Sequence, residues 1–363
     1  MTFIKIFLLI ILVGIAYLYT PKFGALPKGK SLERIQKSSH YKLGKFRNLE
    51  PTRQMTVDIS PLSIMSDYFF GSHPDTKPKH PVPAVKTDLN NLPADENVLI
   101  WFGHSSYFAQ LHDKKFLFDP VFSKTASPVP FNVVAFEGTD IYKPEDMPQI
   151  DYLIITHDHW DHLDYPTIKK LKPTISKVIT GLGNGAHFRR WGFDEAKIIE
   201  LDWNEKFSAE NLEIYCLPAR HFSGRGLTAD KSLWASYLIK SDDYKLYAGG
   251  DSGYGLHYKE IGDKFGQIDI ALLDSGQYDK NWKYIHEQPH QVIQAARDLN
   301  TKNLLPVHNS KFTISNHPWY EPLEILSGFE DKENFQILTP KIGEPVNIDS
   351  AKYRFDKWWK SIM

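Results

Sequence analysis

Apolar residues recur along the chain in short runs separated by polar segments, a pattern that predicts strands alternating with helices. The runs over 152–155, 268–273 and 304–307 have the length of buried strands. A helix is expected over 166–171, because its first residue is proline, and another over 289–299, where apolar residues have helical spacing. Strands that alternate with helices are typical of the α/β class.

Further strands are expected on both sides of this region. Residues 98–102 and 108–118 are apolar or alternate with polar residues, as the strands of a hairpin do. Between 197 and 249 strands are expected at 198–201, 212–217, 235–240 and 245–248. The pattern also predicts a strand at 177–180 and helices at 184–191, 256–265, 318–328 and 352–362.

An uninterrupted apolar run lies near the N-terminus, from Ile6 to Tyr19, and Lys5 precedes it. It is shorter than the roughly 20 residues that usually cross a bilayer. No small-residue cleavage site follows it directly, so residues 1–22 are expected to form an uncleaved signal anchor that associates the protein with a membrane. The alternative is a helix buried in the globular domain.

The side of the membrane on which the rest of the chain lies stays open. A signal anchor alone would favour export. The positive-inside rule favours the cytoplasm instead, because the basic residues that follow the run outnumber Lys5: Lys22, Lys28, Lys30 and Arg34.

Charge and cysteine content narrow the classes of partner. The 363 residues carry 43 Lys and Arg against 44 Asp and Glu, a net charge of −1. A nucleic-acid-binding protein usually has a basic excess or stripe, so no nucleic-acid partner is expected. Cys216 is the only cysteine and lies in an apolar run, so it is expected in the core and no internal disulfide can form.

A dense group of metal-ligand side chains follows the strand expected over 152–155. His157 and His159 are two residues apart, so in an extended loop they point to the same side and can bind one ion together. Asp161 and His162 lie where the chain starts to coil and can reach a second ion. Imidazole and carboxylate are preferred ligands of zinc and similar divalent ions. The alternative is a solvated loop that is merely rich in histidine.

The pattern His157-x-His159-x-Asp161-His162 resembles the signature of the metallo-β-lactamase fold superfamily. In that superfamily the remaining ligands lie far downstream, in the order His, Asp, His. This chain offers one residue of each type in that order, each after an apolar or β-prone run: His221, Asp251 and His308. The resemblance implies an α/β fold, the four-layered αβ/βα sandwich.

The resemblance also implies two zinc ions (Zn²⁺) and a role for each ligand. The implied ligands of the first ion are His157, His159 and His221. Those of the second are Asp161, His162 and His308. Asp251 would bridge the two ions as the catalytic carboxylate, because one carboxylate has two oxygen atoms to share.

Other motifs occur in an order that resembles the N-acyl-phosphatidylethanolamine-hydrolysing phospholipase D family: 101–105, 117–123, 162–165, 200–203, 249–254, 283–286 and 306–322. The likeness runs from about residue 46 to about residue 343. It implies hydrolysis of a phospholipid to phosphatidic acid and an N-acylethanolamine, with no side-chain nucleophile. The implied partners are the phospholipid substrate and a membrane surface, and a homodimer is a candidate assembly.

Three further residues are candidates near the site. Asp119 either orients a ligand histidine or is simply a carboxylate in a turn at a strand end. His286 matches a family histidine that faces the substrate, which implies a catalytic role in phosphate binding or proton transfer. His104 matches a recurrent family position, with structural and catalytic roles both open. Other histidines are expected to be ordinary residues: His187, His257, His290 and His317.

The expected organisation is an anchor (1–22), a lead-in segment with a Pro-rich linker (23–97), a metallo-β-lactamase-like catalytic domain (98–345) and a C-terminal helical tail (346–363). The loop 222–226 departs from the family, which leaves the preferred head group open. One alternative function is a metal-dependent lactonase or a hydrolase of soluble phosphoesters. Another is a membrane-tethered metal-binding protein without catalytic activity, against which the intact ligand set argues.

Overall fold

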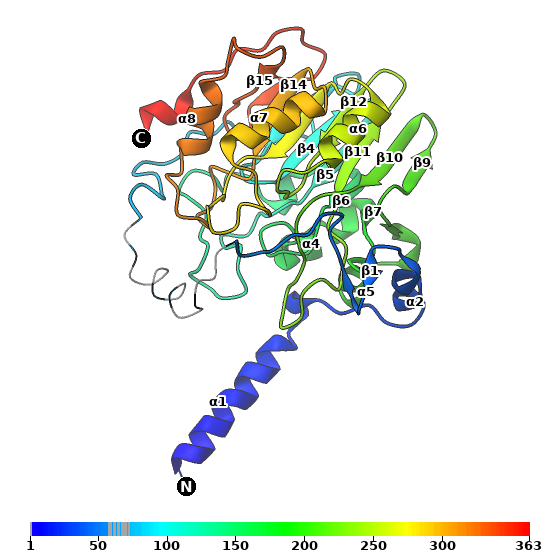
Figure 1. Ribbon diagram of the computed structural model, residues 1–363, viewed down its shortest axis with the longest axis vertical. Coiled ribbons are helices and arrows are strands. Elements are labelled where there is room, and N and C mark those ends of the chain that lie inside the picture. The colour runs from blue at the N-terminus through cyan, green and yellow to red at the C-terminus, as the bar shows by residue number, and fades with distance from the viewer. Residues whose placement is uncertain (1, 57–59, 61–62, 64–65, 67–70, 72) are drawn as a thin grey trace.

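The computed structural model describes the whole chain except residues 1, 57–59, 61–62, 64–65, 67–70 and 72 (Figure 1). Part of the expected lead-in over 23–97 therefore lies outside the described residues. Its described part includes α2 (Gly29–Lys37) and a hairpin of β1 (Tyr41–Lys42) and β2 (Lys45–Phe46). Phe46 is buried in the main core, so this hairpin packs on the body of the protein.

Two mixed β-sheets form the centre of the molecule. The first has the strand order β16-β3-β4-β5-β6-β7-β8. Its strands are β3 (Val98–Trp101), β4 (Tyr107–Leu111), β5 (Lys114–Phe118), β6 (Ile150–Ile155), β7 (Ile175–Gly181), β8 (Ile198–Leu201) and β16 (Pro345–Asn347). The second has the order β15-β14-β13-β12-β11-β10-β9. Its strands are β9 (Lys206–Ala209), β10 (Leu212–Leu217), β11 (Ser236–Lys240), β12 (Lys245–Ala248), β13 (Ile270–Asp274), β14 (Asn303–Val307) and β15 (Gln336–Ile337).

Alternating side chains of the first sheet face two different cores. Along β6, Ile154 belongs to the core shared with the second sheet. Its neighbours Leu153 and Ile155 belong to a second core together with Ile168 of α4 (Tyr165–Leu171) and Phe188 of α5 (Gly185–Arg190). The apolar run over 152–155 is therefore a strand buried on both faces, which explains its lack of alternation.

The second sheet is covered in the same way on its outer face. Ile270 and Leu272 of β13 face the shared core, whereas Ala271 and Leu273 pack with the helices α6 (His257–Phe265), α7 (Pro289–Asp298) and α8 (Glu321–Ser327). Figure 1 shows α6 and α7 on the side of the sheets opposite to α4. Helices, sheet, sheet and helices thus form four layers, and the predicted αβ/βα sandwich is confirmed.

Strand direction brings the functional loops together. Strands β5 to β8 are parallel to one another, and so are β12 to β15. The loops after β6, β12 and β14 leave at the carboxyl ends of their strands, the usual place for ligand sites in such sheets.

Some sequence predictions need correction. The expected strand over 108–118 is a hairpin of β4 and β5, with His112 and Asp113 in the turn at positive φ values of 47° and 67°. Strand β9 was not predicted, because none of its four residues is buried and it lies at the edge of the sheet. The short edge strands β15 and β16 were also missed.

The expected helix over 352–362 is wrong for most of its length. Only the 3-10 turn η5 (Trp358–Ser361) is helical, and residue 346 lies within β16 rather than in a separate tail. Before η5 the chain has no regular secondary structure, and Gln336 Oε1 accepts the backbone N–H of Tyr353 at 3.1 Å. Trp358 and Trp359 are buried in the main core, so packing rather than helix propensity sets the path of this segment.

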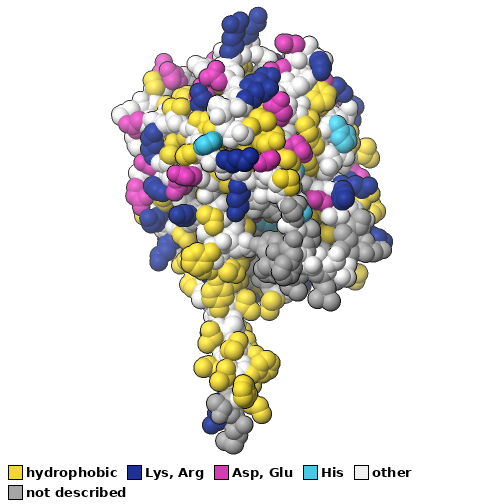
Figure 2. Space-filling model, turned by 90° about the vertical axis from the view of Figure 1, so that its left-hand side faces the viewer, with side chains coloured by type: hydrophobic (Ala, Val, Ile, Leu, Met, Phe, Trp, Pro, Cys, Tyr) yellow, Lys and Arg dark blue, Asp and Glu magenta, His cyan; other side chains and the backbone are white. Residues whose placement is uncertain are grey.

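The N-terminal apolar run forms α1 (Thr2–Leu18), which projects from the body (Figure 1). Its apolar side chains are exposed, for example Phe7 at 63% and Leu12 at 61%, so the alternative of a buried helix is wrong. Figure 2 shows hydrophobic side chains along the projecting helix. Among the residues that the structure describes, no helix is both long and apolar enough to cross a membrane.

Candidate metal centre

The loop that follows β6, here called the metal loop (residues 157–163), meets the loops after β10 and β12. His157, His159, His221 and Asp251 each offer one atom to a group in which all atoms lie within 4.8 Å of one another. His159 Nδ1 lies 2.9 Å from His157 Nε2 and 3.3 Å from His221 Nε2. Ring nitrogens that converge so closely form a site where a cation can take the place of hydrogen bonds.

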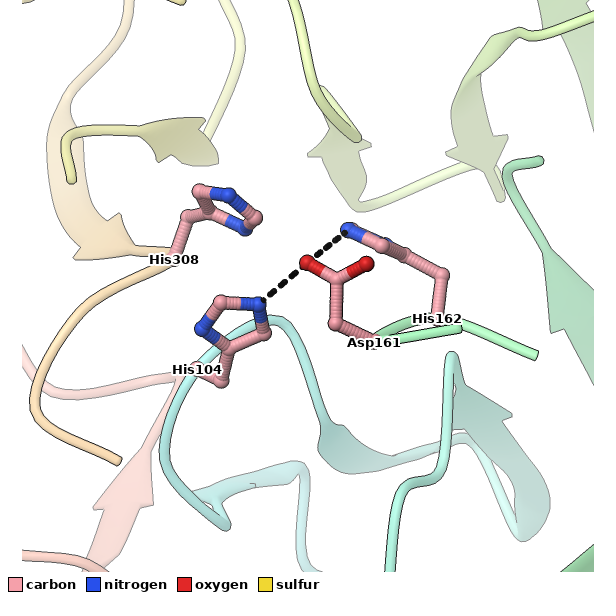
Figure 3. Close-up of side chains that lie close together, drawn as sticks. All are labelled: His104, Asp161, His162 and His308. Atoms are coloured by element: carbon pink, nitrogen blue, oxygen red, sulfur yellow. Dashed lines mark hydrogen bonds and ion pairs between the residues drawn. The ribbon is translucent and has the colours of Figure 1, made fainter. Parts of the chain in front are cut away.

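A second group lies beside the first and consists of His104, Asp161, His162 and His308 (Figure 3). His104 Nε2 lies 2.9 Å from Asp161 Oδ2, and His162 Nε2 lies 3.6 Å from the same oxygen. The structure thus brings together the ligands implied for a second ion and adds His104 to them.

Asp251 reaches both groups. Its Oδ2 atom lies 3.8 Å from His157 Nε2 and 3.1 Å from His162 Nε2, and its Oδ1 atom lies 3.1 Å from His308 Nδ1. One carboxylate therefore stands between the two sets of histidines, where a bridging ligand must stand.

The donor set and its burial fit two metal ions. Within the described part of the chain, His162 Nε2 and Asp251 Oδ1 are buried, and although each has a neighbouring polar atom at 3.1 Å, neither makes a hydrogen bond of acceptable geometry. Unpaired buried polar atoms are costly and call for an explanation. Histidine and carboxylate donors around such atoms suit divalent transition metals, so these residues could hold a pair of ions.

Burial sets the protonation of most of the histidines. It lowers the pKa of His159 to about 4 and holds the pKa values of His157, His221 and His308 well below the ordinary value. These imidazoles are neutral at pH 7 and have a lone pair free for a metal.

His162 and Asp251 behave differently. Burial alone would lower the pKa of His162, but the carboxylates of Asp251 and Asp161 outweigh burial and raise it well above the ordinary value. Burial raises the pKa of Asp251 to about 6, although His162 opposes that change. A bound cation would favour the deprotonated form of both groups.

Asp119 contacts a metal-site histidine. Its Oδ2 atom lies 2.8 Å from His162 Nδ1, and Thr156 donates to both of its oxygens, from N at 2.8 Å and from Oγ1 at 2.6 Å. Because Nδ1 of His162 is engaged in this way, Nε2 is left for the metal site.

The loops that carry His104 and His308 hold each other in place. His104 N donates to the carbonyl oxygen of Asn309 at 2.9 Å, and His308 N donates to that of His104 at 3.0 Å. Both histidines have positive φ values, 54° and 65°, a left-handed backbone that is uncommon for residues other than glycine. The reciprocal hydrogen bonds fix this conformation, and with it the direction of both rings.

His286 lies on another side of the site and forms a third close group with Asp251 and His308. Its Nδ1 atom lies 2.7 Å from Oδ2 of Asp274, a fully buried carboxylate. Burial lowers the pKa of His286 and raises that of Asp274 well above its ordinary value. The hydrogen bond to Asp274 fixes the orientation of the ring.

Several residues at the site were missed by sequence reasoning. Asp274 follows a predicted strand, which was the one available signal. Asp158 lies between two ligands in sequence, yet its carboxylate contacts His187, which was expected to be an ordinary residue. Arg225 donates to backbone carbonyls of the metal loop. Such contacts leave no local sequence pattern.

A cavity opens beside the first group of ligands. It has a volume of about 350 Å³ and is lined by His221, Phe222, Asp230, Trp234 and residues of the segment 46–54. Small-molecule sites are typically cavities of this order of size.

Comparisons with known proteins agree with this geometry. Residues 114–309 match the family model described as "Beta-lactamase superfamily domain". An uncharacterized protein of Mycobacterium tuberculosis (strain ATCC 25618 / H37Rv) is 32% identical over 339 residues, which cover 90% of this chain and 88% of the relative. The N-acyl-phosphatidylethanolamine-hydrolyzing phospholipase D 1 of Caenorhabditis elegans is 28% identical over 304 residues, 71% of this chain and 84% of the relative.

A solved structure shares the fold. The isothiocyanate hydrolase from Delia radicum gut bacteria has a TM-score of 0.55 and 21% sequence identity, and the match covers 69% of this chain and 98% of that chain. At this identity the likeness concerns the fold alone.

Proposed function

This chain belongs to the beta-lactamase superfamily as a metal-dependent hydrolase, and on that premise we propose that it is a di-zinc phosphodiesterase acting on N-acyl-phosphatidylethanolamine-like lipids. The products would be phosphatidic acid and an N-acylethanolamine. The main support is the Asp251 carboxylate, which lies within 3.1 Å of His162 and of His308 and also belongs to the group of His157 and His159. The lipid phosphodiester is favoured by the similarity to the Caenorhabditis elegans phospholipase D.

The ligands would divide between the two ions as the two groups do. His157, His159 and His221 would bind the first, Asp161, His162 and His308 the second, and Asp251 both. When bound, two zinc ions make water acidic enough to react near pH 7 and neutralise charge on phosphoryl oxygens. His104 would hold Asp161 in position through its 2.9 Å contact.

His286 is the side chain best suited to move a proton. Hydrolysis breaks the bond between phosphorus and the oxygen of the ethanolamine part, and that oxygen must gain a proton as the alcohol leaves. Nδ1 of His286 is engaged with Asp274 at 2.7 Å, which leaves Nε2 free to take the proton that the attacking water loses and to pass it to this oxygen. The same nitrogen, when protonated, can instead bind a phosphoryl oxygen.

We propose that α1 attaches the protein to the membrane that contains its substrate. The loops at the base of α1 add exposed apolar side chains, with Phe131 at 92% and Leu227 at 87%. Tyr17 and Lys22 both donate to the carbonyl oxygen of Pro128, so the loop with Phe131 lies against the base of the helix. Apolar surface beside basic residues suits the interface of a bilayer.

Product analysis by mass spectrometry tests this proposal. Purified zinc-loaded protein is offered N-acyl-phosphatidylethanolamine in mixed micelles, beside a control treated with a chelator. Phosphatidic acid and N-acylethanolamine should form only in the untreated sample. If two metals stay bound without turnover, the lipid assignment is wrong. A screen of lactones and soluble phosphodiesters, with and without detergent, then identifies the class of substrate.

A further inference from the structure

The segment 19–25 connects α1 to the body. Side chains at the C-terminal end of α5 donate hydrogen bonds to its backbone. Arg190 Nη1 donates to the carbonyl oxygen of Gly24 at 2.7 Å. Trp191 Nε1 donates to the carbonyl oxygen of Pro21 at 2.8 Å. The segment is therefore not a free tether between the helix and the domain.

The same segment lies against a histidine that contacts the metal loop. Gly24 has a φ of +66°, and a Cβ atom there would lie 1.8 Å from His187 Nδ1, so no side chain fits at this position. The backbone N–H of Ala25 donates to His187 Nδ1 at 3.1 Å. Because Nδ1 accepts, the proton of the neutral ring is on Nε2, which donates to Asp158 Oδ2 at 3.1 Å.

Asp158 stands between two metal ligands in sequence but points away from them. Its buried carboxylate accepts hydrogen bonds from Gly224 N at 2.7 Å and from Ser232 Oγ at 3.0 Å, besides the one from His187. A carboxylate with protein donors on both oxygens fixes the backbone of the loop at this point.

Arg225 joins these parts. Its side chain is buried, and its Nε and Nη2 atoms donate to the carbonyl oxygen of Lys22 at 3.1 and 2.9 Å. Its Nη1 atom donates to the carbonyl oxygens of Asp158, at 3.0 Å, and of Leu163. The guanidinium also lies 4.0 Å from the centre of the Trp160 ring. One rigid fork thus binds both ends of the metal loop and the segment that follows α1.

We propose that Arg225 is a positioning residue of the metal centre, which holds the metal loop in its ligand-binding shape by tying it to segment 19–25. It follows that segment 19–25 supports the metal centre. A protein that lacks residues 1–25 would therefore bind metal more weakly. The inference rests on the proposed metal centre and not on the lipid substrate. Lysine cannot replace Arg225 fully, because an ammonium lacks the planar fork that reaches both sides.

The test measures metal in the full-length protein. Zinc release to a chelator is compared among wild type, Arg225→Ala and Arg225→Lys, together with the melting temperature of the metal-free forms. Arg225→Ala should bind zinc roughly 10 to 100 times more weakly, and Arg225→Lys should recover part of that loss. The visible spectrum of cobalt-substituted protein should change in Arg225→Ala, since a shifted loop alters the geometry around the ion. Unchanged zinc release and an unchanged spectrum would overturn the proposal.

A glycine pair tests the segment without touching Arg225 and decides the matter if Arg225→Ala does not fold. Gly24 and Gly29 have φ values of +66° and +53°, but only Gly24 has His187 in the way of a side chain. Gly24→Ala should speed zinc release, whereas Gly29→Ala, which carries similar backbone strain, should not. Equal zinc release from both variants would contradict the role of the segment.

The result is independent of the lipid assignment. Wild type that holds zinc but does not cleave N-acyl-phosphatidylethanolamine would refute the proposed substrate and leave this inference standing. Wild type that holds no zinc would overturn both.

Discussion

The metal loop has two faces: the front carries the metal ligands, and the back carries Asp158 and contacts Arg225. Polar atoms on the two faces find their partners in opposite ways. On the front, ring nitrogens of His157 and His159 meet each other, and on the neighbouring loop Asp251 Oδ1 has no hydrogen-bond partner within the described residues. On the back, the Asp158 carboxylate is hydrogen-bonded by protein donors, and Arg225 donates to the backbone. Polar atoms on the front gain their missing partner only from a cation, whereas those on the back already have partners in the protein. A metal site therefore needs polar atoms left unpaired on one side and a backbone fixed from the other.

The largest effect is expected from changing Asp251, the carboxylate that lies close to both groups of metal ligands. Asp251→Asn keeps the shape of the side chain but removes its negative charge. Turnover should fall by more than the roughly 100-fold that a lost outer partner costs, while the protein still folds. Activity and metal content are measured together, with Asp243→Asn, a change at an exposed carboxylate, as the control. Near wild-type turnover in Asp251→Asn would show that two metals do not act together.

Removing a support of one ligand should have a smaller effect. In Asp119→Asn the carboxylate that contacts His162 Nδ1 at 2.8 Å is replaced by an amide. Affinity for the second ion should fall by about 10 to 100 times, with the first ion retained. Zinc stoichiometry during chelator titration measures this. Asp194→Asn is the matched control, because Asp194 accepts a backbone N–H from Ala196 but contacts no metal-site histidine.

Two zinc ions held by Asp119→Asn as tightly as by wild type would show that Asp119 is only a carboxylate of the turn. The contact between Asp119 and His162 would then contribute to folding alone, and the role proposed for Arg225 would be unaffected.

The sequence predicted the metal ligands on the front of the loop but not the hydrogen bonds on its back. The motif around His157 and His159 is local, and strand-end residues such as Asp251 and His308 could be matched in order. The back depends on pairs far apart in sequence, such as Arg225 with Lys22, and the acceptors are backbone carbonyls that any residue has. Nothing in the residue types therefore indicates such contacts before the fold is known.

The same contrast holds for the fold. Strands buried on both faces were found because their apolar runs are unbroken, as in 152–155 and 304–307. The edge strand β9 and the irregular C-terminal segment before Trp358 were not, because tertiary packing rather than local pattern determines them. Prediction from sequence thus works best where burial is continuous and weakens at edges.

The smallest expected effect concerns a support more remote from the ions. Lys311 is buried, and its Nζ atom donates to the carbonyl oxygens of Phe102 at 3.1 Å and Val121 at 2.9 Å. Burial lowers its pKa from the ordinary value of 10.5 to about 8. Above about pH 8 the unfolded chain keeps a proton that the folded protein loses, so this group makes the free energy of unfolding rise with pH, by up to about 1.4 kcal/mol per pH unit.

Lys311→Met should remove that slope between about pH 8 and about pH 9.5, below the range where tyrosines ionise. Urea unfolding of the metal-free proteins measures it, with the exposed Lys332→Met as control, and an identical slope in Lys311→Met would mean that the buried amine stays charged.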